Sequence, residues 1–278
     1  MIRHLVTALA IGLAIPSSGF SQAAESSPAP SAAESPVPAQ PAGPRIVYNN
    51  VPNDGNYIAI TFDDGPNPVQ TPRLLDILAK RNIKATFFVV GQCVKEYPEV
   101  LKRIVREGHE IGNHSWSHPN LGKMSDAAVK AQLQDTHDLV LKTAGVPPKS
   151  FRPPYGSFSA RQQQWAYKEF GYKTILWGVD PFDWKKPGAS VIAQRIVSQT
   201  KSGDIILAHD IHKQTIDAME ETLDGLIARG FRFATVSELM AMEKPQPPKP
   251  AVSAASPARP AAPAKASPGA KVSSRAKK

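Results

Sequence analysis

Two adjacent carboxylates, Asp63 and Asp64, lie in the sequence TFDDGPN, directly after an apolar run and directly before a Gly-Pro turn. Neighbouring aspartates repel each other, so the arrangement is stable only where a cation or hydrogen-bond donors balance the charge. A solvent-exposed turn is the alternative, because Asp, Gly, Pro and Asn are all common turn residues. This heptapeptide alone does not decide between a cation site and a turn.

Two histidines supply candidate partners for these carboxylates. His114 and His118 are spaced as H-x-x-x-H in NHSWSHPN, which brings two imidazoles within reach of one ion if the intervening residues make a helical turn. In isolation, the pair is better explained as loop histidines bonded to the backbone. Joined to an aspartate from another strand end, it forms a two-His, one-carboxylate set with open positions for water, which is typical of a catalytic metal site. One of the paired aspartates would then be a ligand, and the other would be a base.

Further polar clusters follow later apolar runs. They are RPPYG with Arg152 and Tyr155, DPFDW with Asp180, Asp183 and Trp184, and LAHD with His209. Taken singly, each has a structural explanation: Arg152 as an ion pair, Asp183 as a helix cap, and His209 as a buried histidine bonded to backbone. Together, these explanations require unrelated coincidences at several strand ends. The combined pattern therefore favours an enzyme.

The elements that must position these residues are short β-branched or aromatic runs alternating with amphipathic helical stretches. The expected strands are 57–62, 85–90, 109–112, 150–152, 173–179, 204–208 and 231–235. This alternation predicts an α/β fold with a parallel sheet and outer helices, and about seven units suggest closure into a barrel. A doubly wound open sheet is the alternative. In either architecture, reactive groups gather at the carboxyl ends of the strands.

The motifs TFDDGP, HSWSH, RPPYG, DPFDW and LAH occur in this order, and together they resemble the five motifs of the NodB-type polysaccharide deacetylases, the fourth carbohydrate esterase family. The resemblance covers roughly residues 55–240. It implies a distorted (β/α) barrel and one divalent metal ion, usually Zn²⁺, with Co²⁺ or another divalent ion as alternatives. It also implies that Asp64, His114 and His118 are the metal ligands.

The same resemblance implies roles for the remaining site residues. Asp63 would be the general base, and Arg152 would pair with it and hold it ionised and oriented. His209 would be the general acid, oriented and tuned by Asp183. The resemblance also assigns substrate contacts: the backbone N–H of Tyr155 would donate to the oxyanion, and Trp184 and Leu207 would wall an acetyl pocket.

The chemistry of amide hydrolysis agrees with these roles. An amide needs a strong nucleophile, stabilisation of the tetrahedral oxygen and a proton for the departing amine. A divalent ion lowers the pKa of bound water to about 7 and polarises the carbonyl. The resemblance therefore implies, as the leading hypothesis, the removal of N-acetyl groups from glycans that contain N-acetylglucosamine, such as peptidoglycan or chitin oligosaccharides.

Two other functions stay open. The same motifs would support O-deacetylation, for instance of acetylated xylan, and a catalytically silent glycan-binding protein is an alternative from a different class. The intact Asp63, His114, His118 and His209 argue against the silent protein. A two-carboxylate glycosidase is disfavoured, because adjacent aspartates do not suit the opposed geometry, roughly 5–9 Å apart, that this mechanism needs.

The two ends of the 278-residue chain differ in composition from its middle. Residues 1–23 are predicted to be a secretory signal peptide, since their apolar run is shorter than the about 20 residues of a membrane span. Residues 24–45 read as a disordered Pro/Ala/Ser-rich linker, 46–243 as the catalytic domain, and 244–278 as a disordered basic tail. We therefore expect an exported protein, periplasmic or extracellular, with no transmembrane segment.

The net charge of +9 resides mainly in the tail, which carries Lys and Arg but no acid. A nucleic-acid role is not expected, because it would need basic residues on a folded face with aromatic or helical readout, and the tail has no aromatic residues. An anionic cell-envelope polymer is the better partner for the tail, and a purely solubilising extension is an equally good explanation. Cys93 is the sole cysteine, so no intramolecular disulfide forms.

We expect the protein to be a monomer.

Overall fold

The computed structural model describes residues 43–244. The predicted signal peptide, most of the predicted linker and nearly all of the predicted tail lie outside these residues, and their boundaries stay predictions. Within residues 43–244, no helix is long and apolar enough to cross a membrane.

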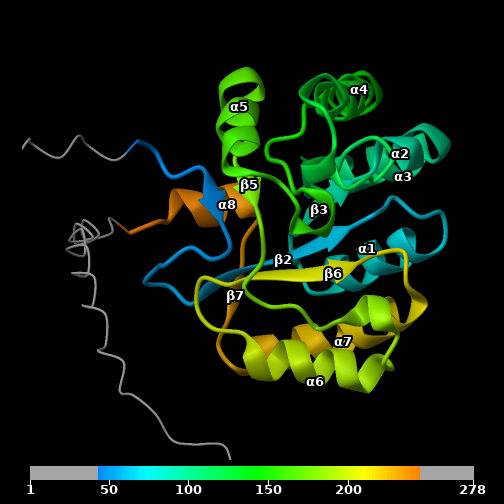
Figure 1. Ribbon diagram of the computed structural model, residues 1–278. Helices are drawn as coiled ribbons and strands as arrows, with labels where there is room; N and C mark the ends of the chain where they lie inside the picture. The colour runs from blue at the N-terminus through cyan, green and yellow to red at the C-terminus, as the bar shows by residue number, and fades with distance from the viewer. Residues whose placement is uncertain (1–42, 245–278) are drawn as a thin grey trace, which may run out of the picture. The chain divides into compact units, whose positions relative to one another are not determined.

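The described chain alternates strands and helices, as the sequence predicts (Figure 1). Its strands are β1 (Val47–Tyr48), β2 (Tyr57–Asp63), β3 (Thr86–Val89), β4 (Glu110–Asn113), β5 (Thr174–Ile175), β6 (Ile205–His209) and β7 (Arg232–Phe233). A parallel sheet has the order β4-β3-β2-β6, with β7 paired to the start of β2, while β1 and β5 form a separate parallel pair. The strand β1 is not anticipated by the sequence patterns.

The fold is a distorted (β/α) barrel, and single-residue bridges account for the distortion. The strand expected at residues 150–152 does not form. Instead, Phe151 alone makes parallel bridges to Asn113 of β4 and Thr174 of β5. On the other side, Val179 makes a single parallel bridge to Ile206 of β6. Isolated bridges thus replace a continuous ladder between β4 and β6. The segments follow one another as in a barrel, but regular hydrogen bonding does not close them.

Helices surround the strands (Figure 1). They are α1 (Gln70–Lys80), α2 (Gly91–Glu96), α3 (Pro98–Arg106), α4 (Asp126–Ala144), α5 (Ala160–Phe170), α6 (Ala189–Gln199), α7 (Lys213–Ala228) and α8 (Val236–Ala241), with 3₁₀ turns η1 (Leu121–Lys123), η2 (Pro154–Gly156) and η3 (Asp183–Lys185). In Figure 1, α2, α3 and α4 lie on one side of the central strands, and α6 and α7 lie on the other.

The two-residue period of β2 decides which of its side chains enter the barrel. Ile58, Ile60 and Phe62 pack in the main core with the apolar faces of the helices. Ala59 packs in the smaller inner cluster, so Thr61 and Asp63, on the same face, also point inward. Backbone pairing sets Asp63 beside His209, the last residue of β6. The strand register therefore brings two of the predicted site residues together.

Candidate active site and metal centre

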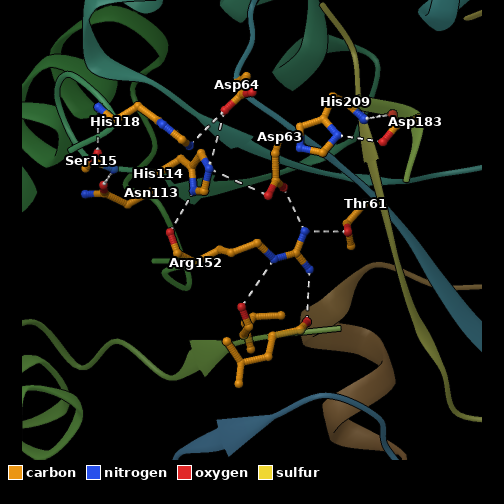
Figure 2. A network of polar contacts seen from close by, with 12 residues as sticks. Thr61, Asp63, Asp64, Asn113, His114, Ser115, His118, Arg152, Asp183 and His209 are labelled. Carbon is orange, nitrogen blue, oxygen red and sulfur yellow. Dashed lines mark hydrogen bonds and ion pairs between the residues drawn. The ribbon is translucent and has the colours of Figure 1, made fainter. Parts of the chain in front are cut away.

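The predicted metal ligands meet at one point beyond the carboxyl ends of β2 and β4 (Figure 2). Asp64 Oδ1 lies 3.5 Å from His114 Nε2 and 3.4 Å from His118 Nε2. The ligand atoms of these three side chains all lie within 4.8 Å of one another. The cluster is partly buried, and all three side chains line one cavity.

The charge and hydrogen bonding of Asp64 fit a cation. Its Oδ1 atom is buried and has no hydrogen-bond partner among the described residues, which is costly unless another group satisfies it. Burial opposes the charge of this carboxylate, but the adjacent His114, His209 and His118 outweigh burial and hold the pKa of Asp64 below its usual range. An ionised carboxylate beside two imidazoles is a donor set that suits a divalent ion such as Zn²⁺.

The loop between the two histidines is not a helical turn, although such a turn is the simplest way for the H-x-x-x-H spacing to bring two imidazoles to one ion. Residues 114–118 form an irregular bend in which Ser115 and His118 have left-handed backbone angles. The side chain of Asn113 accepts from the Ser115 N–H at 2.8 Å, and Ser115 Oγ accepts from the His118 N–H at 3.1 Å. Side-chain acceptors therefore fold the loop, and the imidazole centroids lie 5.0 Å apart.

Asp63 has surroundings quite different from those of Asp64. Its Oδ1 accepts a hydrogen bond of 2.7 Å from Arg152 Nη1, and the same nitrogen lies 2.7 Å from Thr61 Oγ1. The other guanidinium nitrogens donate to the backbone carbonyls of Ile175 and Leu176. Both Arg152 and Asp63 are almost completely buried. The predicted Arg–Asp pair is thus a fixed unit, in which Arg152 already donates to one carboxylate oxygen of Asp63.

The predicted pair of His209 and Asp183 is also present. Asp183 Oδ1 lies 2.8 Å from His209 Nδ1, and Asp183 Oδ2 accepts from the His209 N–H and from Thr215 Oγ1, each at 2.8 Å. Burial works against a charged imidazole, but Asp183, with smaller contributions from Asp63 and Asp64, raises the pKa of His209 to about 9. With Nδ1 bonded to the carboxylate, Nε2 is the ring nitrogen left to face the cavity that His209 lines.

The predicted substrate contacts lie on the walls of the same cavity. Tyr155, Trp184 and Leu207 all line it, whereas Arg152 and Asp183 stand behind the residues that they support. The ring of Tyr155 packs edge-on against His118, with centroids 4.7 Å apart. Trp177 also lines the cavity, and sequence reasoning missed it because nothing in its local pattern separates it from a core tryptophan.

A second residue that the sequence patterns did not single out is Asp210. It is fully buried and accepts a hydrogen bond from Thr71. A Cβ atom at position 65 would lie only 2.3 Å from its carboxylate oxygens. Burial, helped by the charges of Asp64 and Asp63, raises its pKa to about 7, although Thr71 opposes this shift. Only glycine at position 65 lets the carboxyl group pack against the loop that carries Asp64. The adjacency of Asp210 to His209 was the signal available in the sequence.

Left-handed backbone outside glycine is concentrated around the site. Among the described residues, it occurs at Asp64, Ser115, His118, Tyr155, Phe182 and Lys186, and elsewhere only at Asn56 and Asn82. Such conformations cost about 1–3 kcal/mol each and persist where the surrounding structure enforces them. The strained positions thus mark the loops that present the ligands and the cavity walls.

A parallel α/β fold that holds two histidines and a carboxylate at its strand ends, beside an Arg-bound aspartate and an Asp-bound histidine, is typical of metal-dependent hydrolases. Comparison with known proteins identifies which hydrolases these are. The family model described as polysaccharide deacetylase matches residues 50–175. The chain belongs to this family, which confirms the resemblance drawn from its five motifs.

Individual relatives agree with the family. The chain is 42% identical over 195 residues to a peptidoglycan-N-acetylglucosamine deacetylase of Bacillus cereus, covering 68% of this chain and 91% of the relative. It is 42% identical over 187 residues to the peptidoglycan-N-acetylmuramic acid deacetylase PdaC of Bacillus subtilis, covering 67% of this chain but only 39% of that protein. The solved Bc1960 peptidoglycan N-acetylglucosamine deacetylase superimposes with a TM-score of 0.68 at 34% identity, covering 72% of this chain and 96% of that structure.

Proposed function

We propose that this protein is a metal-dependent N-deacetylase that hydrolyses the acetamido groups of peptidoglycan-type glycans. One observation carries the proposal: the candidate metal centre, the candidate base Asp63 with its Arg152 partner, and the candidate acid His209 meet at one cavity. The names of the relatives favour peptidoglycan over chitin oligosaccharides and over acetylated xylan.

In the proposed mechanism, Asp64, His114 and His118 would hold one divalent ion, which we take to be Zn²⁺. When bound, such an ion lowers the pKa of water and polarises a carbonyl oxygen. Asp63 accepts the proton of the attacking water, while Arg152 keeps its carboxylate oriented and its charge balanced. The departing amine takes a proton from His209 Nε2, because Asp183 stabilises the imidazolium before the reaction.

The cavity walls position the rest of the substrate. Leu207 and Trp184 offer apolar surface for the acetyl methyl group. The N–H of Tyr155 would donate to the oxygen that becomes negative in the tetrahedral transition state, a contribution that is typically large in acyl transfer. In this arrangement, each group acts on a different atom of the same acetamide.

Acetate release tests the proposed function. The full chain, loaded with Zn²⁺ or Co²⁺, should release acetate from peptidoglycan strands, and a chelator should abolish the release until metal is restored. Acetylated xylan serves as the O-acetyl comparison and chitin oligomers as the neutral N-acetyl comparison. Full activity in chelator-treated, metal-free protein would contradict the mechanism, and acetate release from xylan alone would show an O-deacetylase.

The pH dependence tests the assignment of His209 as the acid. Since the acid must be protonated, activity should fall as the pH rises through the His209 pKa of about 9. Asp183→Asn removes the charge that raises this pKa and leaves burial, which lowers it. The alkaline limb of kcat/KM should therefore move to lower pH in this variant.

Thr215→Val is the matched control for this profile, because it removes one hydrogen bond to Asp183 and leaves the charge. Its alkaline limb should stay close to that of the wild type. If Asp183→Asn lowers kcat/KM equally at every pH, Asp183 does not set the protonation of His209, and the acid must be sought elsewhere.

The proposals about location and tethering concern residues outside the described range. Export to the cell envelope or beyond agrees with the peptidoglycan-directed names of the relatives. Electrostatic tethering of the basic tail to an anionic envelope polymer, the signal peptide and the monomeric state stay predictions.

A further inference from the structure

The segment that follows Val179 places two aromatic side chains at the rim of the cavity. Phe182 is 41% exposed and Trp184 is 49% exposed, although both are large apolar residues. Their ring centroids lie 6.2 Å apart at 67°, and Trp184 lines the cavity itself. Exposed aromatic surface beside a binding cavity suits the apolar C–H face of a sugar ring.

Cations surround these rings. Lys185 Nζ lies 4.8 Å from the Phe182 centroid and 4.9 Å from the Trp184 centroid. Arg195, from α6, lies 6.0 Å from the Phe182 ring and donates to the Pro181 carbonyl. Lys186 is exposed and directly follows Lys185 at the end of η3. The positive charge therefore lies on the His209 side of the cavity.

This positive charge is not neutralised within the domain. Lys213, on the neighbouring helix, pairs with Asp217. By contrast, no carboxylate between residues 43 and 244 lies within ion-pair distance of Lys185 or Lys186. Asp180 and Asp183 are the acids of this segment: Asp180 Oδ1 accepts the Phe182 N–H at 2.7 Å, and Asp183 is bonded to His209. Lys185, Lys186 and Arg195 outnumber these two acids, so an anion that enters the rim meets a net attraction.

The segment is fixed rather than loosely attached. Asp183 is completely buried and bonded to His209 and Thr215, while its neighbours on both sides are exposed. Phe182 and Lys186 have left-handed backbone angles, with φ of 56° and 54°. One buried anchor and two left-handed residues thus fix the backbone that carries the aromatic and cationic side chains, which lowers the entropic cost of binding to them.

We propose that Phe182, Trp184, Lys185 and Lys186 form an anionic-sugar subsite, in which the rings contact the pyranose and the lysines bind a carboxylate carried by the glycan. This inference rests on the proposed deacetylase function and narrows its substrate to acid-bearing strands. The carboxylate has two sources of the same chemistry: the lactyl group of a muramic residue when no peptide is attached, or the acidic residues of an attached peptide.

The double variant Lys185→Gln/Lys186→Gln tests the subsite in the full, metal-loaded chain. Acetate release would be measured on chitotetraose, on peptidoglycan strands stripped of peptide, and on peptide-bearing strands, with KM and kcat separated. We expect KM on an acid-bearing strand to rise by roughly tenfold with kcat unchanged, and its salt dependence to weaken. The kinetics on neutral chitotetraose should not change. An effect confined to stripped strands identifies the lactyl carboxylate, and one confined to peptide-bearing strands identifies the peptide.

Lys142→Gln/Lys168→Gln is the matched control. Both lysines are exposed in the last turns of α4 and α5, and in this topology helices end away from the carboxyl ends of the strands. This control removes the same charge and should leave every KM unchanged. An unchanged KM on both acid-bearing strands, or an equal rise on chitotetraose, would overturn the subsite. If the wild type deacetylates chitotetraose, but Lys185→Gln/Lys186→Gln does not change the ratio of KM on acid-bearing strands to KM on chitotetraose, only the subsite proposal fails. If no substrate releases acetate, the proposed function fails with it.

Discussion

Asp64→Asn is expected to lose the bound metal and the activity together, whereas Asp63→Asn should keep the metal and lose turnover. The two carboxylates are adjacent in sequence, but their surroundings differ. Asp64 Oδ1 is buried without a hydrogen bond and lies between two imidazoles, so it is the oxygen that needs a cation. Asp63 Oδ1 is already bonded to Arg152. Loss of a general base typically costs about 10²–10⁴-fold in rate.

Metal content per folded protein, measured by elemental analysis beside acetate release, separates the two variants. Asp138→Asn is the control, because Asp138 lies on the exposed face of α4 and bonds only to Gln134 among the described side chains. It should retain metal and activity. If Asp63→Asn loses the metal and Asp64→Asn retains it, the two roles have been exchanged, and the buried Arg–Asp pair must serve the ion instead.

The fold class followed from the sequence because its signals are local. Alternating apolar runs and amphipathic stretches predicted most of the strands, and helix starts are equally local: Ser159 and Gln162, three residues apart, form a capping box at the start of α5. The strand expected at residues 150–152 failed for a non-local reason. Phe151 bridges two separate strands through single residues, and the neighbouring Arg152 turns its side chain into the barrel to reach Asp63. Such a compromise depends on partners that lie far away along the chain.

For the site as well, local sequence predicted some features and long-range packing determined others. The five motifs named the candidate side chains, and the structure places Asp63, Asp64, His114, His118 and His209 around one cavity. The sequence could not show how the His114–His118 loop reaches its geometry, because that depends on acceptors from Asn113 and Ser115 rather than on helical spacing. It also could not show that Asp210 packs against Gly65, since the two residues belong to different strand ends. Residue types carry the chemistry, while long-range packing fixes its geometry.

Arg152→Met should produce the largest loss of stability of any single site variant considered, in addition to lost turnover. The guanidinium is completely buried, bonds to Asp63, Thr61 and two carbonyls, and lies 4.1 Å from the Phe88 ring centroid. Methionine fills similar space but donates nothing, so Asp63 would remain as a buried charge without its partner. Breaking a buried ion pair in this way typically costs about 3–5 kcal/mol in the free energy of unfolding.

A double-mutant cycle with Asp63→Asn distinguishes the pair from packing alone. If the buried charge is the cause, Arg152→Met should cost much less in the Asp63→Asn background, because no unpaired carboxylate then remains. Denaturant unfolding with chelator present keeps metal binding out of the comparison. Arg161→Met, at an exposed pair with Asp126, should leave the free energy of unfolding nearly unchanged. Equal costs of Arg152→Met in both backgrounds would show that Arg152 stabilises the barrel through its carbonyl and ring contacts, and that its role toward Asp63 is confined to catalysis.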